Sequence, residues 1–296
     1  MFRGVFPAVV TPFKEDGSVD FRSFEAMCDY LADAGVHGLY VCGTTGEFAF
    51  LTVEERKSLL ERAIACVGNR LTILVQAGHN ALRPTIELVK HAQKSGAKGV
   101  GVISPYFYAY DDEALFRYHS AILDAAPDFP ILVYNIPQRT GVDMSVSLME
   151  RLRSRHKNFA GVKESGNEDN IRRWLTLQDD SFSVFCGIDD LEYESFRRGC
   201  HAIVASFGNW MPRTFRKFVE AAERGDWDTA RLLQARISQL VEPGKVINQI
   251  ATIKAGLQLR GLPGGHVRAP NRDLLPDEVN SLRQTLDRLG FLDGEQ

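Results

Sequence analysis

Lys163 is the residue whose position most strongly suggests chemistry. It follows the apolar run Phe159–Val162, which is typical of a short buried strand, and Glu164, Ser165 and Gly166 then turn the chain away. A lysine whose amine is kept neutral by a desolvating pocket can attack a ketone and form a Schiff base, which acts as an electron sink for carbon–carbon bond chemistry. A single lysine at a strand end is more often a solvated surface residue than a nucleophile. The residues expected beside it in the fold therefore distinguish the two interpretations.

Polar residues after other apolar runs have types that suit the same reaction. Tyr134 lies near the end of the run Ile131–Asn135, and a tyrosine can transfer the protons of imine formation if a relay carries them onward. Thr44 and Thr45 lie in a glycine-containing turn, where hydroxyls and backbone amides can hold a small carboxylate. Arg139 can bind a second carboxylate with two parallel hydrogen bonds.

The elements that would position these residues repeat along the chain. Each short apolar run is followed by a segment of helical period, and Thr52-x-x-Glu55 has the spacing of a helix capping box. This alternation predicts a (β/α)8 TIM barrel, with an open doubly wound sheet as the alternative, although no G-x-G-x-x-G follows the first run. The eight predicted strands are Gly4–Val10, Gly38–Cys42, Leu71–Gln76, Gly99–Ser104, Ile131–Asn135, Phe159–Lys163, Phe182–Cys186 and Ala202–Phe207.

The pattern changes after the eighth run. Residues from about Pro212 to Phe291 are helical in period, with interruptions expected at Pro243-Gly244 and in the loop "GLPGGHVRAPNRD". We therefore predict a barrel over residues 1–211, and over residues 212–296 the last barrel helix with an appended helical region. In a barrel, the carboxyl ends of all strands meet at one rim, so Lys163, Tyr134, Arg139 and the two threonines are expected to share a site.

Composition narrows the class of protein. The formal net charge of the 296 residues is -3, which indicates no nucleic-acid partner and no anionic membrane surface. The sequence contains no run of 18 apolar residues and begins without the layout of a signal peptide. Five cysteines without a C-x-x-C pair are typical of reduced thiols in a cytoplasmic protein, and a metal site is not expected.

Three motifs together resemble one family. "GTTGE", "YNIPQRTG" and "GVKES" are similar to the motifs of the dihydrodipicolinate synthase / N-acetylneuraminate lyase family, and the likeness extends from Gly4 to the C-terminal helices. Members of this family are pyruvate-dependent class I aldolases built on the (β/α)8 barrel. The resemblance implies a lyase that acts on pyruvate and a small aldehyde or keto acid, without metal or organic cofactor, as a homotetramer.

The resemblance also implies a role for individual residues. Lys163 would be the Schiff-base lysine, Tyr134 the tyrosine that shuttles its protons, and Thr44 the next member of the relay. Thr45 would hold the pyruvate carboxylate, while Gly187 and the backbone around Val204 would face the bound keto acid.

The substrate within the family depends on a few positions. Arg139 of "PQRTG" matches the arginine with which dihydrodipicolinate synthases bind aspartate semialdehyde, which favours that reaction and a place in lysine biosynthesis. At the position of Phe107, those enzymes carry a tyrosine. That tyrosine enters the active site of a neighbouring subunit and completes the proton relay there. Asp189 and Ser206 lie where sialic-acid lyases bind sugar hydroxyls. The alternatives are a 2-keto-3-deoxy sugar acid aldolase or dehydratase, an N-acetylneuraminate lyase-like enzyme, and a catalytically impaired ligand-binding homologue.

Structural interpretations compete at some of these positions. The pair Asp189-Asp190 is more typical of a helix N-cap followed by a first-turn acid than of a site that binds sugar hydroxyls, and Glu47 is expected to be structural. Two aspartates after the seventh strand also argue against a phosphate-binding barrel enzyme. The resemblance finally places a lysine effector pocket at a dimer interface, where inhibited enzymes carry an imidazole and an acid; here Val53 and Pro84 stand at those positions. The other positions of this pocket would be Phe48, Ala49, Arg56, Asn80 and Tyr106.

Overall fold

The strands form a parallel barrel. The computed structural model describes residues 2–246 and 248–295, and within these ranges one sheet holds eight parallel strands in the order β1-β8-β7-β6-β5-β4-β3-β2. The parallel bridge between Ala8 and Tyr40, with the Val9 amide donating to the Tyr40 carbonyl at 3.1 Å, brings the two edge strands together. The predicted (β/α)8 fold is confirmed. The strands are β1 Gly4–Pro7, β2 Gly38–Val41, β3 Thr72–Gln76, β4 Gly99–Ile103, β5 Ile131–Asn135, β6 Phe159–Glu164, β7 Ser183–Cys186 and β8 Ala202–Ala205.

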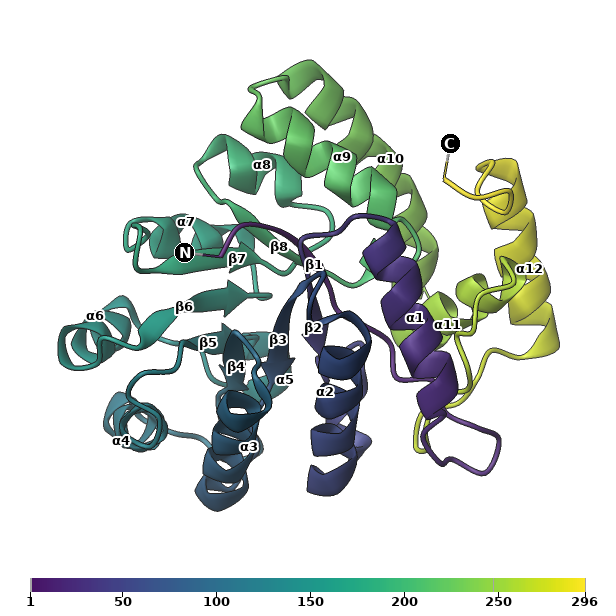
Figure 1. Ribbon diagram of the computed structural model, residues 1–296. Helices are drawn as coiled ribbons and strands as arrows, with labels where there is room; N and C mark the ends of the chain where they lie inside the picture. Colours follow the sequence, from purple (N-terminus) through teal and green to yellow (C-terminus); the bar gives the residue numbers. More distant parts are fainter. Residues whose placement is uncertain (1, 247, 296) are drawn as a thin grey trace.

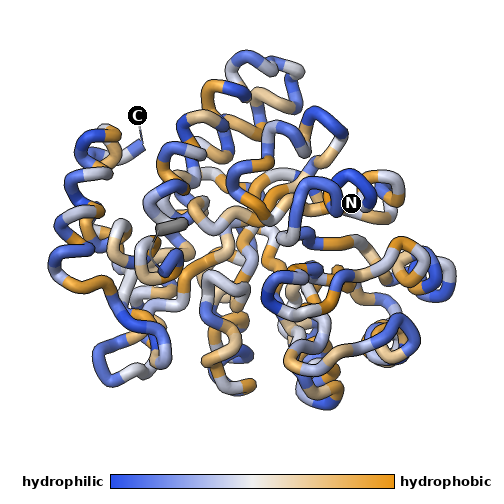
Figure 2. The backbone as a smooth tube through the Cα atoms, turned by 180° about the vertical axis from the view of Figure 1, so that it is seen from behind, coloured by the Kyte–Doolittle hydropathy of each residue, from blue (hydrophilic) through white to orange (hydrophobic). Residues whose placement is uncertain are grey.

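Helices surround the strands (Figure 1). Several begin at a side chain that accepts a hydrogen bond from the first turn, and the expected capping box between Thr52 and Glu55 is present at α2. Figure 2 shows hydrophobic residues gathered where the helices face the barrel and hydrophilic residues on the outer turns. These helices are α1 Phe21–Asp33, α2 Val53–Val67, α3 Leu82–Ser95, α4 Asp112–Asp124, α5 Pro137–Thr140, α6 Val146–Arg155, α7 Glu168–Leu175, α8 Glu192–Arg197 and α9 Pro212–Glu223, with short 3-10 turns η1 Phe48–Phe50 and η2 Phe207–Asn209.

A small apolar cluster fills the interior of the barrel. Its members lie on the strands or, in the case of Ala8, directly after one, and members from the same strand are two residues apart, as expected for side chains that point to the same face. Tyr40 has the largest side chain of this cluster, and its ring extends across the barrel interior to β4. A Cβ atom at Gly101 would lie 2.0 Å from the Tyr40 hydroxyl oxygen, so the absent side chain at position 101 makes room for the tyrosine. The cluster consists of Phe6, Ala8, Tyr40, Leu74, Leu132, Phe185, Ala202 and Val204.

A helical region follows α9. It consists of α10 Trp227–Val246, α11 Gln249–Leu259 and α12 Pro276–Arg288, and Figure 1 shows α11 and α12 on the side of the barrel where α1 lies. The prediction that Pro243-Gly244 interrupts the helix was wrong, because α10 continues through both residues. Proline removes one helical hydrogen bond, and here this loss falls in the last turn of α10. The division at residues 211 and 212 stays a prediction.

The described residues include no helix with both the length and the apolar character needed to cross a membrane. All five cysteines are free; four are buried, and Cys66 is half-buried.

Candidate active site

The carboxyl ends of the strands enclose a cavity of about 510 Å³. Side chains or backbone from β5, β6, β8 and the loops after β2, β5 and β7 line it, as barrel geometry predicts for an active site. Every site residue predicted from the sequence lines this cavity: Lys163, Tyr134, Thr44, Thr45, Arg139, Gly187, Val204, Asp189 and Ser206.

The Lys163 amine is held inside this cavity. Lys163 is only 5% exposed, and its Nζ donates a hydrogen bond to Ser165 Oγ at 2.6 Å. The Ser165 hydroxyl in turn donates to the Gly187 carbonyl at 3.1 Å. A Cβ atom at Gly187 would lie 2.8 Å from the Lys163 Nζ, so glycine leaves the amine accessible. The sequence interpretation missed Ser165, although its place two residues after the lysine, on the same side of the strand, was a usable signal.

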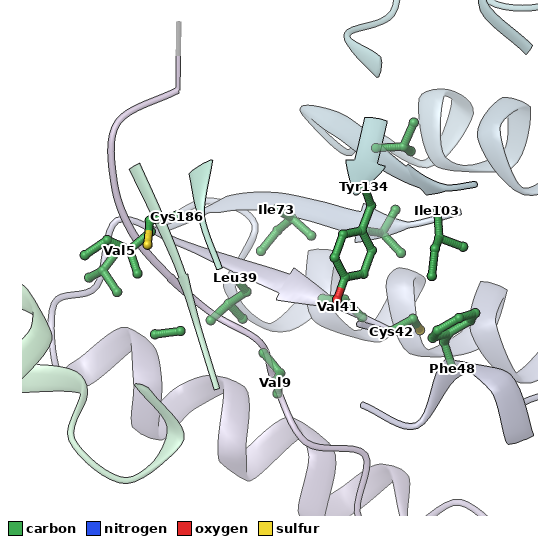
Figure 3. Close-up of a cluster of buried hydrophobic side chains, with 14 of the residues drawn as sticks. Val5, Val9, Leu39, Val41, Cys42, Phe48, Ile73, Ile103, Tyr134 and Cys186 are labelled. Atoms are coloured by element: carbon green, nitrogen blue, oxygen red, sulfur yellow. The ribbon is translucent and has the colours of Figure 1, made fainter. Parts of the chain in front are cut away.

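Tyr134 lies directly beside Lys163. The two residues are partners in the ladder between β5 and β6, and the Lys163 Nζ lies 3.8 Å from the centre of the Tyr134 ring. Figure 3 shows the tyrosine within a buried cluster that includes Ile103, Cys42 and Phe48, with its hydroxyl at the end of the ring farthest from the strand. That hydroxyl lies 3.0 Å from Thr44 Oγ1. The structure thus contains a continuous contact from the amine to a phenol and on to a threonine hydroxyl.

The charge of Lys163 makes the Tyr134 phenol more acidic. Burial by itself would raise the pKa of Tyr134, but the nearby ammonium and the hydrogen bonds with Thr44, Lys163 and Ser165 outweigh it and lower the pKa below its ordinary value. A phenol of lowered pKa releases its proton more readily, which is what an acid/base group in imine chemistry requires.

A second layer of hydrogen bonds fixes the ends of β5 and β6. Glu164 points to the opposite face of β6 from Lys163 and accepts hydrogen bonds from Asn135 Nδ2 at 2.7 Å and Trp174 Nε1 at 2.6 Å. Burial raises the pKa of this carboxyl group despite these donors. Asn135 also donates to Asp143 at 2.9 Å. This network restrains the two strand ends that carry Tyr134 and Lys163.

The turn that carries Thr44 and Thr45 has an unexpected backbone. The left-handed conformation falls on Cys42 and Glu47, with φ of 53° and 55°, and not on the glycines that the sequence interpretation invoked for the turn. Both residues are buried, and the Glu47 carboxylate forms an ion pair with Lys254 at 2.5 Å. The expectation that Glu47 is structural is confirmed.

Asp189 uses its carboxylate to hold the loop after β8. The two oxygens accept hydrogen bonds from the backbone amides of Ser206 at 3.1 Å and Phe207 at 2.9 Å. Burial raises the pKa of Asp189 to about 6, against the effect of those amides. The interpretation of Asp189-Asp190 as a helix N-cap with a first-turn acid was wrong, because α8 begins at Glu192 and its N-cap residue is Leu191.

Arg139 and Phe107 occupy exposed positions. Arg139 lies on the short helix α5 at the edge of the cavity, and it forms no salt bridge with any residue in the described ranges. Phe107 is 85% exposed, with φ of 87°, and its ring packs edge-to-face on that of Tyr108. Neither of these two aromatic residues lines the cavity of its own chain.

Comparison with known proteins agrees with this geometry. The model of the Dihydrodipicolinate synthetase family matches residues 1–289. The chain belongs to this family. As a member, it is a lyase of the class I aldolase type, whose chemistry depends on a Schiff-base lysine.

Relatives within the Dihydrodipicolinate synthetase family have more than one named activity. A 4-hydroxy-tetrahydrodipicolinate synthase of Thermus thermophilus is 33% identical over 297 residues, covering 100% of this chain and 99% of that protein. A prophage protein of this family from E. coli K12, solved in complex with pyruvate, is 31% identical, with a TM-score of 0.93 and coverage of 98% and 99%. A dihydrodipicolinate synthase from Cyanidioschyzon merolae with lysine bound is 30% identical, with a TM-score of 0.92 and coverage of 98% and 99%. The sialic acid aldolase of Ruminococcus gnavus is 27% identical, with a TM-score of 0.91 and coverage of 98% of both chains.

The part of this family member that the structure describes holds no group of three or more histidine, cysteine, aspartate or glutamate side chains arranged to bind a metal ion.

Proposed function

We propose that the protein condenses pyruvate with aspartate semialdehyde to form 4-hydroxy-tetrahydrodipicolinate, with Lys163 as the Schiff-base residue. The observation that carries this proposal is the buried Lys163 amine, which contacts the Tyr134 ring while the Tyr134 hydroxyl contacts Thr44. A module that only bound a ligand would need neither a sequestered amine nor a phenol of lowered pKa.

The residues divide the reaction between them. The Lys163 Nζ attacks the keto carbon of pyruvate, and the keto oxygen leaves as water, so that a C=N bond replaces the C=O bond. Loss of a proton from the methyl group then gives an enamine, whose carbon attacks the aldehyde carbon of the second substrate. The amino group of that substrate then attacks the C=N carbon, which closes the ring and releases the Lys163 amine. Tyr134 and Thr44 move the protons of these steps. Thr45 binds the pyruvate carboxylate, and Gly187 and Val204 face the bound keto acid.

Arg139 is the residue that we assign to the second substrate. Its guanidinium lacks an ionic partner among the described residues and lies at the edge of the cavity, so it is free to pair with an incoming carboxylate. We expect Arg139→Ala to raise the KM for aspartate semialdehyde and to lower kcat/KM, because a substrate carboxylate is left unpaired. The loss of kcat/KM should correspond to about 2–4 kcal/mol of lost transition-state stabilisation. Steady-state kinetics with pyruvate and aspartate semialdehyde measures both constants.

Two controls separate substrate recognition from general damage. Pyruvate capture at Lys163 should be unchanged in Arg139→Ala, and Arg139→Lys should be intermediate, because lysine keeps the charge without the bidentate geometry. Aspartate semialdehyde, 2-keto-3-deoxygluconate, N-acetylneuraminate and 4-hydroxy-2-oxoglutarate should be compared. Wild-type activity on a sugar acid, with none on the semialdehyde, would contradict the proposed substrate while leaving the imine chemistry in place.

A sugar-acid aldolase is the second candidate. Phe107 supports it, because the chain lacks the hydroxyl that the resemblance implies for a dihydrodipicolinate synthase. Asp189 weighs against it, because both carboxylate oxygens are already bound by backbone amides and the side chain is buried. In this alternative, Ser206→Ala would impair turnover and Arg139→Ala would have little effect.

We further propose that the protein is a cytoplasmic homotetramer that needs no metal or organic cofactor. The five free cysteines support a reducing compartment. The exposed Phe107 and Tyr108 support association with a second copy of the chain, since monomers rarely leave adjacent large aromatic side chains in water.

We expect millimolar lysine to leave the activity unchanged. At the proposed effector pocket, Val53 and Pro84 supply no carboxylate or imidazole, while the buried Arg56 adds a guanidinium that donates to the Gly78 and Gln76 carbonyls. A bound lysine would bury its ammonium without a partner and beside another positive charge, which is costly. Initial rates measured across a lysine titration test this, and a saturable inhibition curve would contradict it.

A further inference from the structure

The turn that holds Thr44 and Thr45 is bounded by two residues in an unfavourable conformation. Cys42 and Glu47 both adopt positive φ although neither is glycine, and together they enclose residues 43–46, which we call the carboxylate loop. Residues other than glycine rarely adopt this conformation, because their Cβ atom crowds the backbone, and it persists only where surrounding contacts enforce it. The contacts that enforce it in Glu47 come from the far end of the sequence.

Among the described residues, the hydrogen-bond partners of the Glu47 carboxylate all come from the C-terminal region. Oε1 accepts from Lys254 Nζ at 2.5 Å, while Oε2 accepts from the Arg268 amide and from Asn271 Nδ2, both at 3.1 Å. The side chains of Glu47 and Lys254 are 0% and 1% exposed. An ion pair this far from water contributes strongly to the choice of one backbone arrangement, because loss of either partner leaves a buried charge.

Lys254 also ties the other side of the carboxylate loop. Its Nζ donates to the Thr11 carbonyl and to the His266 carbonyl, each at 2.7 Å, in addition to Glu47. The Thr11 hydroxyl donates to the Gly46 carbonyl at 2.8 Å. The three hydrogens of the ammonium thus join the loop after β1, the residue that bounds the carboxylate loop at its C-terminal end, and the segment after α11.

We infer that Glu47 and Lys254 are positioning residues through which the C-terminal region sets the keto-acid affinity of the active site. This inference rests on the proposed function, because the carboxylate loop presents Thr45 to the keto acid and Thr44 to Tyr134. The helix that carries Lys254 also contributes Gln249 and Ile250 to the cavity wall. The helical region after the barrel therefore both lines the active site and positions its residues.

The test compares two glutamates that bind the same C-terminal segment. Glu47→Gln places an amide where Lys254 needs a carboxylate, whereas Glu55→Gln removes the ion pair of Glu55 with Arg268, at 2.6 Å, without touching the carboxylate loop. Pyruvate is added over a range of concentrations, borohydride reduces the imine, and mass spectrometry measures the labelled fraction. We expect the pyruvate concentration for half-maximal labelling to rise about 10- to 100-fold in Glu47→Gln and to remain unchanged in Glu55→Gln.

The outcomes separate this inference from the proposed function. A wild-type protein that takes no pyruvate onto Lys163 overturns the proposed function and this inference with it. A folded Glu47→Gln variant with wild-type half-saturation, or an equal rise in both variants, overturns this inference alone.

A second measurement serves if Glu47→Gln does not fold. Hydrogen–deuterium exchange of the wild-type chain, with and without borohydride-fixed pyruvate, should show slower exchange both in residues 42–47 and in residues 264–273, a segment with no residue in the cavity wall. Slower exchange confined to residues 42–47 would overturn the inference.

Discussion

Replacement of Lys163 by alanine is expected to abolish turnover and to abolish covalent capture of pyruvate. The amine is the nucleophile of the proposed reaction, and no other amine lines the cavity in the described part of the chain. After incubation with pyruvate and reduction with borohydride, the wild-type chain should gain the mass of one reduced pyruvate adduct, and the variant should gain none.

Peptide mapping provides an internal control, because the protein contains a second buried lysine. Lys254 is as well shielded as Lys163, but its ammonium is paired with a carboxylate and donates to two carbonyls. The adduct should therefore lie on the peptide that contains Lys163 and be absent from the one that contains Lys254. An adduct elsewhere, or an unchanged wild-type mass, would refute imine formation at Lys163.

Replacement of Tyr134 by phenylalanine should slow imine formation by about 10²-fold or more, because the phenol that exchanges protons with the reacting centre is lost. The fold should persist, since the ring still fills the same space beside Lys163. Stopped-time borohydride trapping measures the rate of imine formation, and the saturating level of labelled protein reports on pyruvate binding.

Tyr40→Phe is the matched control for this substitution. Both tyrosines are buried in the barrel, but the Tyr40 hydroxyl has no hydrogen-bond partner in the described part of the chain, whereas that of Tyr134 contacts Thr44. Removal of an unpartnered buried hydroxyl should be neutral or stabilising, on the order of 1 kcal/mol, without a comparable loss of rate. If both variants slowed equally, or if Tyr134→Phe reacted at the wild-type rate, the relay through Tyr134 would be wrong.

The fold and the membership of the site follow from sequence because both depend on strand periodicity. Residues at the ends of parallel strands must meet at one rim, so the sequence is enough to place Lys163, Tyr134 and Arg139 together. Ser165 could have been added from the same periodicity. The register between β5 and β6, which sets Tyr134 against Lys163, requires the structure.

Other features depend on contacts between segments that are distant in sequence. The sequence around Asp189-Asp190 does not predict that the Asp189 carboxylate accepts hydrogen bonds from the two backbone amides that follow β8. Likewise, "GTTGE" indicated that Glu47 is structural but could not identify Lys254, more than two hundred residues away, as its partner. The prediction at Pro243 failed because α10 continues through the proline, although proline beyond the first turn of a helix removes a hydrogen bond and crowds the preceding turn.

The fit of Tyr40 against Gly101 restricts the order in which this barrel can evolve. A side chain gained at position 101 would overlap the tyrosine hydroxyl, so that step alone is incompatible with the present packing. Reduction of Tyr40 to a smaller apolar residue leaves a void, which weakens the core without creating a steric overlap. A lineage that replaces this pair must therefore shrink position 40 before it enlarges position 101, and the reverse route is closed.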